Sequence, residues 1–395
     1  MSDVLSLPFR TTIARTVAIN RTVFAAGLVL LAVLLAAAGL APHNTWRMPA
    51  LVLVGVGIGA VLLRTTFGFA GAFRALIERG DASGFRAHAV MLIVATALMM
   101  PMLAQGKLFG LDLHGGETPV GVGFAVGALL FGAGMQVGGG CASGTLFALG
   151  GGNAKLIGTL AGFVIGSGLG AAHMGFWWSL PTLPAVTAQG LVGYGPAIAI
   201  QLAALVLLWW IAGRASPDKS VKVLIWGGAG LAVLNAATLV LAGKPWGETS
   251  AFALWGSQAA SWLGFDAHGW TYWQRPGFKG QLDRSLLLDT TSVMDGAILI
   301  GAALAAAWSG MFRPTFGGGG RAWAGALLGG IAMGYGARLS NGCNIGAYFS
   351  AIAVGNLSGW AWLLLALAGS WIGVQLRPLF GLLRADTRAT VAPVC

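Results

Sequence analysis

The chain has 395 residues and a formal net charge of +11; 56% of its residues are hydrophobic and only 9% are charged. Its mean hydropathy is +0.78. A soluble domain carries about a quarter charged residues, so the composition excludes an ordinary soluble enzyme or binding module. Uncharged runs such as 23–40 and 360–374 approach the roughly 20 residues that cross a bilayer, whereas a β-barrel has short alternating segments. We therefore predict an all-α polytopic membrane protein.

Apolar segments in chain order predict about ten transmembrane helices. They cover 23–41, 49–63, 87–104, 119–136, 156–176, 195–212, 223–242, 291–311, 322–337 and 358–376. The segment 64–74 is apolar between two arginines but too short to cross, so we expect it to be re-entrant or interfacial. Residues 243–285 are more polar and rich in tryptophan, which indicates a short amphipathic helix and an external loop.

Basic residues gather before the first predicted span, in the central loop and after the last span. They are Arg10, Arg15, Arg21, Arg214, Lys219, Lys222, Arg377, Arg384 and Arg388. The positive-inside rule assigns such clusters to the cytoplasm. Both termini and the central loop are therefore predicted to be cytoplasmic, with an even number of crossings. Insertion in the lipid bilayer, the expected partner, therefore explains the net positive charge, and no nucleic-acid partner is expected. The first apolar run is too long for a cleavable signal peptide and lacks a cleavage site.

One stretch of the chain occurs twice. The shared pattern is G-x-G-x5-G-C-x2-G-x2-F, at 132–147 and 334–349, with a constant offset of 202 residues between Cys141 and Cys343. An odd number of predicted spans separates the two cysteines, so the two copies are predicted to face opposite sides of the membrane. Such inverted-topology repeats are a common basis of secondary transporters.

The duplication and the charge pattern divide the chain into two repeats and their flanks. The predicted units are a cytoplasmic basic tail (1–22), an extra N-terminal transmembrane helix and loop (23–48), a first repeat (49–213), a cytoplasmic linker (214–222), a second repeat (223–378) and a cytoplasmic C-terminal tail (379–395). The first helix thus lies outside the duplication.

The duplicated Gly-Cys element suits an anion. Glycines disfavour a continuous helix, so we predict that Gly140-Cys141 and Gly342-Cys343 each begin a short re-entrant half-helix. A helix N-terminus carries free N–H groups and partial positive charge. Irregular backbone at membrane depth must be buried or line a cavity. The soft, polarisable thiol favours a sulfur-containing anion, and both cysteines are predicted to line a central pathway. The alternative is that each cysteine is a small buried filler.

Polar residues beside the cysteines are candidate substrate contacts. Ser143, Asn341 and Asn344 could hydrogen-bond a substrate, or could instead cap broken helix ends. Arg338 and Gln136 each lie five residues before a cysteine. An arginine within the membrane is by default a functional candidate.

Arg338 also has structural alternatives. It could snorkel to the interface, or pair with Asp289 or Asp295. These two residues and Asp283 are the acids that we consider for proton or sodium coupling.

Metal and cofactor motifs are not expected. The cysteines lack C-x-x-C spacing, and no G-K-[ST] follows the glycine runs at 138–140 and 317–320. The histidines have no metal spacing and are expected at interfaces or in loops: His43, His88, His114, His173 and His268. We therefore predict no metal, no cofactor and no nucleotide coupling within this chain.

Over about 60–390, the sequence resembles the YeeE/YedE sulphur-transport family, which includes bacterial thiosulfate permeases. The resemblance is carried by Gly-Gly-Gly-Cys141-Ala-Ser-Gly and Gly-Tyr-Gly-Ala-Arg-Leu-Ser-Asn-Gly-Cys343-Asn-Ile-Gly-Ala-Tyr-Phe. It implies an inverted-repeat transporter of the bacterial inner membrane, in which thiosulfate passes along Cys141 and Cys343 through S–H···S hydrogen bonds. Thiosulfate permeases often carry a further cysteine in an early R-x-x-F-C segment, where this chain has Gly68.

These observations lead to a transporter, not an enzyme. We predict uptake of thiosulfate or a related small sulfur-containing anion. One alternative is a membrane thiol protein that passes persulfide sulfur to a cytoplasmic sulfur-carrier protein. The others are a transporter of a selenium compound, which the resemblance also allows, and a conduit in which the cysteines only pack.

Overall fold

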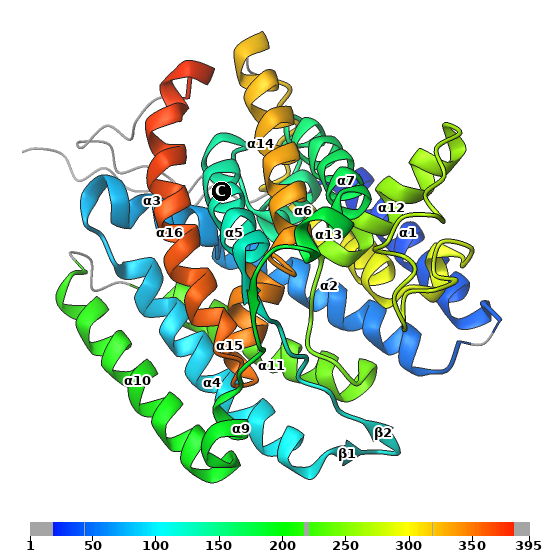
Figure 1. The fold of residues 1–395 in the computed structure, drawn as a ribbon. Helices are drawn as coiled ribbons and strands as arrows, with labels where there is room; N and C mark the ends of the chain where they lie inside the picture. The colour runs from blue at the N-terminus through cyan, green and yellow to red at the C-terminus, as the bar shows by residue number, and fades with distance from the viewer. Residues whose placement is uncertain (1–18, 43, 217–220, 318, 383–395) are drawn as a thin grey trace, which may run out of the picture.

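The computed structural model describes residues 19–42, 44–216, 221–317 and 319–382, and over these ranges nearly all of the regular secondary structure is helical (Figure 1). The predicted tails at 1–22 and 379–395 fall largely outside the described residues, as does part of the linker at 214–222. His43 and Cys395 also lie outside them.

The helices and short strands follow in chain order. They are α1 (Arg21–Leu40), α2 (Arg47–Thr65), α3 (Phe69–Arg79), α4 (Ser83–Gln105), β1 (Lys107–Leu108), β2 (Leu111–Asp112), β3 (Val120–Gly121), α5 (Val122–Val137), α6 (Ala142–Gly150), α7 (Leu156–Ala172), α8 (Met174–Trp178), β4 (Thr182–Leu183), α9 (Ala188–Val192), α10 (Tyr194–Arg214), α11 (Lys222–Ala242), α12 (Thr249–Trp262), η1 (Leu286–Leu288), α13 (Thr290–Trp308), α14 (Gly320–Leu339), η2 (Asn344–Ser350), α15 (Ala351–Ala353), α16 (Ser358–Leu376) and η3 (Arg377–Phe380). The strands form two antiparallel pairs, β1 with β2 and β3 with β4.

A helix occupies each segment that was predicted to span the membrane. Among the described residues, eight helical stretches are long and apolar enough to cross a membrane. These stretches begin at α1, α2, α4, α5, α10, α11, α13 and α16. The remaining predicted spans are α7, which has 17 residues, and α14. The protein is an all-α polytopic membrane protein, and length and composition alone support fewer crossings than the sequence predicts.

The helices around the Gly-Cys elements pack reciprocally. α5, which precedes Cys141, packs against α16, which follows Cys343; α14, which precedes Cys343, packs against α7, which follows Cys141. α5 and α14 also pack on each other at the centre (Figure 1). Such an exchange of partners is what two repeats related by a twofold axis produce.

Glycines at matched positions allow these close crossings. A Cβ on Gly132 would lie 2.2 Å from the carbonyl oxygen of Ala366, and one on Gly334 would lie 2.1 Å from that of Phe163. Because any side chain would collide with backbone there, the first glycine of each motif lets two helices touch directly.

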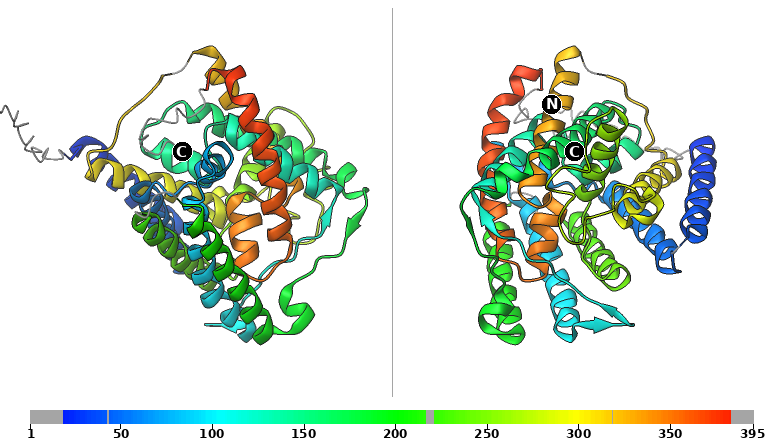
Figure 2. Two further views of the ribbon diagram at one scale, coloured as in Figure 1. Left: turned by 90° about the vertical axis from the view of Figure 1, so that its left-hand side faces the viewer. Right: turned by 45° about the vertical axis from the view of Figure 1, so that its right-hand side comes forward.

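The remaining long helices form the flank of the molecule. α13 packs on α2 and α1, and α4 packs on α10 and α11. α1 lies at the edge of the bundle (Figure 2) and buries only Gly27 and Ala38. Its peripheral position agrees with a helix outside the duplication, and its exposed apolar side chains suit contact with lipid.

Two expectations from the sequence need correction. The external loop predicted at 243–285 does contain the expected short helix, α12, but its start is buried: Trp246 is 1% exposed and Glu248 0%. His88 is not at an interface. It is 1% exposed on α4, and its ring lies 4.7 Å from that of Phe69 and 6.0 Å from that of Tyr348.

Candidate functional site

The first Gly-Cys element turns from α5 into α6. α5 ends at Val137, and Cys141 is the N-cap residue of α6. The Cys141 Sγ accepts the Gly144 N–H at 3.4 Å and lies 3.4 Å from the Ser143 hydroxyl. The chain therefore begins a new nine-residue helix at the cysteine, as predicted, and the thiol takes the place of an ordinary capping oxygen.

The second element has a tighter turn and a different helix. Asn341 has φ 58° and Gly342 has φ 150°, and a Cβ on Gly342 would lie 2.8 Å from the Ala347 nitrogen. Cys343 then caps η2, a π-helix, and its Sγ accepts the Ile345 N–H at 3.4 Å. Asparagine tolerates the left-handed conformation better than most residues, whereas the next position requires glycine.

The fold brings the two predicted cysteines together. Both are free thiols, each 1% exposed, and both belong to one cluster of buried residues. A carboxyl group that was not predicted joins them: the Cys343 Sγ lies 3.8 Å from the Glu248 Oε2. Glu248 also interacts electrostatically with Cys141 and with Asp295.

Several buried polar atoms around the cysteines have no hydrogen-bond partner among the described residues. They include both amide atoms of Asn344, the Glu248 Oε1 and both carboxyl oxygens of Asp295. We call Cys141, Cys343, Glu248, Asp295 and Asn344 the central polar cluster. Buried polar groups in proteins are nearly always paired, so an unpaired set at one place is suited to water or a polar solute.

Arg338 contacts Thr249, the residue that follows Glu248 of this cluster. It is 7% exposed and donates to the Tyr272 hydroxyl, and to the Thr249 Oγ1 at 3.4 Å. Among the described residues, no ion pair joins Arg338 to Asp289 or Asp295. Asp289 instead caps α13 through Ser292.

Arg338 also lines a cavity of about 500 Å³. Its lining combines two arginines with aromatic and polar side chains, including Arg275, Arg338, Tyr272, Trp177, Trp178 and Asn341. We call it the arginine cavity. Asn341 is exposed there and donates to the Thr118 Oγ1 at 2.8 Å. Of the predicted contacts, Asn341 therefore lies at this mouth, whereas Ser143, Asn344, Gly140 and Gly342 lie beside the cysteines.

Gln136 occupies in the first copy the position of Arg338 in the second. Its Nε2 donates to the Ala70 carbonyl at 3.2 Å, and its backbone carbonyl accepts from the Arg377 Nη1 at 2.8 Å. Arg377 is 9% exposed. A buried arginine thus lies near each element, but in the first copy it comes from η3, and the sequence shows it only as part of a basic cluster.

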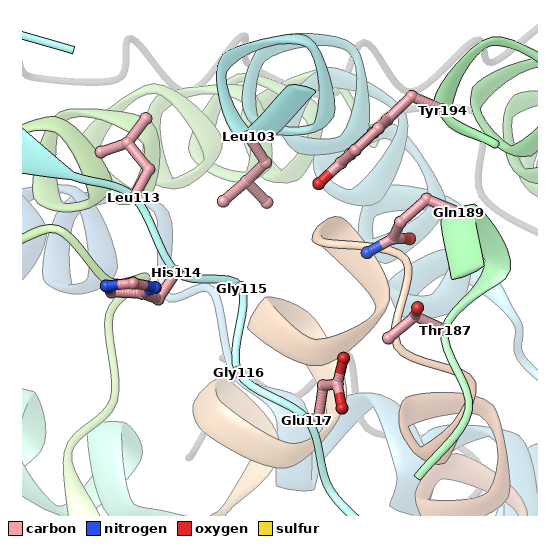
Figure 3. Close-up of a pocket in the computed structure, with 9 residues that line it drawn as sticks. All are labelled: Leu103, Leu113, His114, Gly115, Gly116, Glu117, Thr187, Gln189 and Tyr194. Carbon is pink, nitrogen blue, oxygen red and sulfur yellow. The ribbon is translucent and has the colours of Figure 1, made fainter. Parts of the chain in front are cut away.

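A second cavity, of about 350 Å³, lies beside the loop at 113–117 (Figure 3). Figure 3 shows the side chains of His114, Glu117, Gln189 and Tyr194 around it. Its lining residues include no lysine or arginine. It therefore lacks the fixed positive charge of the arginine cavity and is less suited to an anion.

Glu248 is the main residue that sequence reasoning missed. It follows Lys244-Pro-Trp-Gly and directly precedes α12, so its local sequence indicates a polar loop. The one signal in the sequence was an acidic residue at the start of a predicted amphipathic helix. Among the described residues, no group of three or more His, Cys, Asp or Glu could hold a metal ion.

Comparison with known proteins assigns the chain to a family. The sequence profile of the family described as "Sulphur transport" matches residues 64–372, which include both Gly-Cys elements. The chain belongs to this family. It is 27% identical to the thiosulfate transporter TsuA of Spirochaeta thermophila over 344 residues, covering 81% of this chain and 96% of that protein.

Two further relatives match over a shorter range. The probable transporter YedE of Escherichia coli is 29% identical over 150 residues, covering 38% of this chain and 36% of that protein. YedE of Salmonella typhimurium is 29% identical over 154 residues, with the same coverage. The chain thus aligns with about a third of the length of these YedE proteins.

Proposed function

We propose that this protein takes up thiosulfate, or a closely related small sulfur-containing anion, across the bacterial inner membrane. The pathway runs from the arginine cavity, past Arg338, to Cys343 and then Cys141. The observation that carries the proposal is the burial of two free thiols, one from each copy of the motif, that both interact with the Glu248 carboxyl, together with the unpaired amide of Asn344. The match to TsuA over most of both chains supports the substrate class.

Each part of this route contributes in a different physical way. Arg275 and Arg338 attract the anion into a cavity walled by tryptophan and tyrosine rings. The thiols then offer weak, polarisable S–H donors, which hold a terminal sulfur atom without trapping it. The N-terminus of α6, with Cys141 as its cap, adds N–H groups and partial positive charge. Weak successive contacts allow both entry and release.

The two Gly-Cys elements act as re-entrant half-helices that enter from opposite sides, and both termini are cytoplasmic. The reciprocal packing of α5 with α16 and α14 with α7 supports this arrangement. The antiparallel orientation is testable by labelling single added cysteines in the loops at 106–118 and 311–317 from each side of intact cells, in a background of Cys141→Ser, Cys343→Ser and Cys395→Ser.

Uptake of radiolabelled thiosulfate into a transport-deficient strain tests the function. We expect uptake by the wild-type chain and its loss in Cys141→Ala and in Cys343→Ala, with surface expression checked by blotting of the membrane fraction. Cys395→Ala is the matched control and should transport like wild type. Unchanged uptake in the double variant Cys141→Ala/Cys343→Ala would show that the cysteines only pack.

The substrate and the competing functions are separated by two further measurements. Unlabelled thiosulfate, sulfite, sulfate, sulfide and selenite are added as competitors, and only thiosulfate or another sulfur-terminated anion should compete strongly. A persulfide trapped on either cysteine after turnover would favour sulfur transfer to a cytoplasmic carrier. The 1% exposure of both thiols argues against docking of a soluble carrier in this state.

A further inference from the structure

Glu248 is buried at the point where an anion is proposed to pass. It is 0% exposed, its Oε2 lies 3.8 Å from the Cys343 Sγ, and its Oε1 has no partner among the described residues. The backbone N–H of Ser143, in the first turn of α6, interacts with its carboxyl group. The side chain therefore bridges the two Gly-Cys elements, although it belongs to neither.

A carboxylate in this position conflicts with an anionic substrate. Two like charges a few ångströms apart repel strongly in a poorly solvated site. Thiosulfate can occupy the space beside Cys343 at low cost only when Glu248 is neutral, that is, when it carries a proton. Burial raises the pKa of this carboxyl, in the loop between α11 and α12, to about 8, so the proton is present near neutral pH.

The charged and titratable groups around Glu248 reinforce this requirement. α12 packs against α7, α13 and α14. α13 contributes Asp295, which repels Glu248, and behind it Asp289, which repels Asp295. α14 contributes Arg338, held by Thr249 and Tyr272; α7 has no titratable side chain. The two cysteines complete the surroundings, so the nearest fully buried neighbours add negative charge or none.

We propose that Glu248 binds a proton together with the transported anion and so couples thiosulfate uptake to the inward movement of protons. The outward-facing site takes a proton from the medium onto the Glu248 carboxylate as the anion reaches Cys343. When the site opens to the cytoplasm, water re-solvates the carboxyl, the proton leaves to the cytoplasmic water, and the restored carboxylate repels the anion from Cys343. The proposal rests on the proposed function, since it assigns the coupling ion of the same site.

The test uses the purified full-length protein in proteoliposomes, with the membrane voltage clamped by potassium and valinomycin. We expect wild type to accumulate radiolabelled thiosulfate against its gradient when the outside is acid, by about tenfold per pH unit for each coupled proton. Glu248→Gln, which keeps the shape but cannot ionise, should lose this response. Asp283→Asn, at a side chain that is 70% exposed, is the control and should respond like wild type.

A binding measurement on the wild-type protein tests the proton coupling without any variant. Titration calorimetry of thiosulfate into the wild-type protein, in buffers with different heats of ionisation, reports the protons taken up on binding. We expect almost none at about pH 6.5 and close to one at about pH 9, because the empty site loses its proton between them.

The outcomes separate the two proposals. Wild-type protein that neither binds nor transports thiosulfate overturns the proposed function, and this inference with it. Transport that ignores the pH gradient, with binding that takes up no proton at either pH, leaves the function standing and overturns the coupling. Coupling that persists in Glu248→Gln, with the protein folded by size-exclusion chromatography, assigns the proton to another group and also overturns the proposal.

Discussion

The two Gly-Cys elements share one sequence pattern but hold their cysteines differently. Cys141 caps a regular α-helix and accepts the N–H three residues on, while Cys343 caps a π-helix and accepts the N–H two residues on. Cys141 lies beside the Ser143 hydroxyl, whereas Cys343 faces the Glu248 carboxyl. π-Helical turns are rare and frequent at functional sites. The second copy is therefore the specialised one, and the first is closer to a regular capped helix.

The residues five positions before the two cysteines also differ between the copies. Arg338 lies at the wall of an open cavity, while Gln136 is bound to the Ala70 carbonyl within the packed core. The pattern common to both copies thus builds the crossing and the turn. Under the proposed pathway, the residues that differ between the copies let one half capture the anion and the other release it.

The largest effect that separates the two elements should come from the glycine before each cysteine. Gly342→Ala places a Cβ 2.8 Å from the Ala347 nitrogen at φ 150°, whereas a Cβ on Gly140 meets nothing closer than 3.5 Å. We expect Gly342→Ala to destabilise the fold by about 1–3 kcal/mol and to reduce uptake to background. Gly140→Ala should keep most of the fold stability and most of the uptake. Thermal melting and uptake assays compare them; equal loss in the two variants would contradict the asymmetry.

Exchanging the approach residues should have the next largest effect. Arg338→Gln gives the second copy the residue of the first, and removes a charged donor worth about 1.5–3 kcal/mol. We expect uptake at low thiosulfate concentration to fall about tenfold or more, with a smaller loss at saturation, because Arg338 is proposed to concentrate the anion. The wild-type uptake should also depend more steeply on ionic strength than that of the variant.

Arg321→Gln, at the exposed opposite end of α14, is the control for this exchange and should leave uptake unchanged. The reverse change, Gln136→Arg, puts a charge into a closed site and should destabilise the protein without improving capture. Improved uptake in Gln136→Arg would mean that both approaches are equivalent after all.

The features that could be predicted from the sequence are those that depend on the local pattern of residues. Uncharged runs located the helices, and the duplicated glycines predicted the turns at Cys141 and Cys343 and the short helices that begin there. The helix-crossing role of Gly132 and Gly334 follows from the same pattern, since small residues mark close packing in membranes. These features need no knowledge of what lies across the fold.

What the sequence did not predict depends on long-range packing. Glu248 follows a Pro-Trp-Gly turn typical of a loop, and contacts between segments far apart in the sequence bury it beside Cys343. His88 is similar: its helix was predicted, but two of the aromatic rings that enclose it come from α3 and η2. A polar residue in a loop-like stretch gives no local sign that the fold will bury it.

The smallest of these effects on uptake, and the most specific, should come from Asn344, whose counterpart in the first copy is Ala142. Its side chain is fully buried and has no partner among the described residues. Asn344→Ala therefore removes no hydrogen bond within them, and relieves an unpaired buried amide that costs about 1–3 kcal/mol. If the amide serves the anion, uptake at low thiosulfate should fall about three- to tenfold while the melting temperature stays the same or rises.

Asn356→Ala provides the matched contrast for that experiment. The Asn356 amide caps Ser358 and donates to the Gly116 carbonyl at 3.4 Å, so its loss should lower the melting temperature. A fall in melting temperature for Asn344→Ala would instead assign that side chain a structural role. Loss of uptake without loss of stability is the signature of a group held ready for a substrate, and of the two asparagine variants only Asn344→Ala is expected to show it.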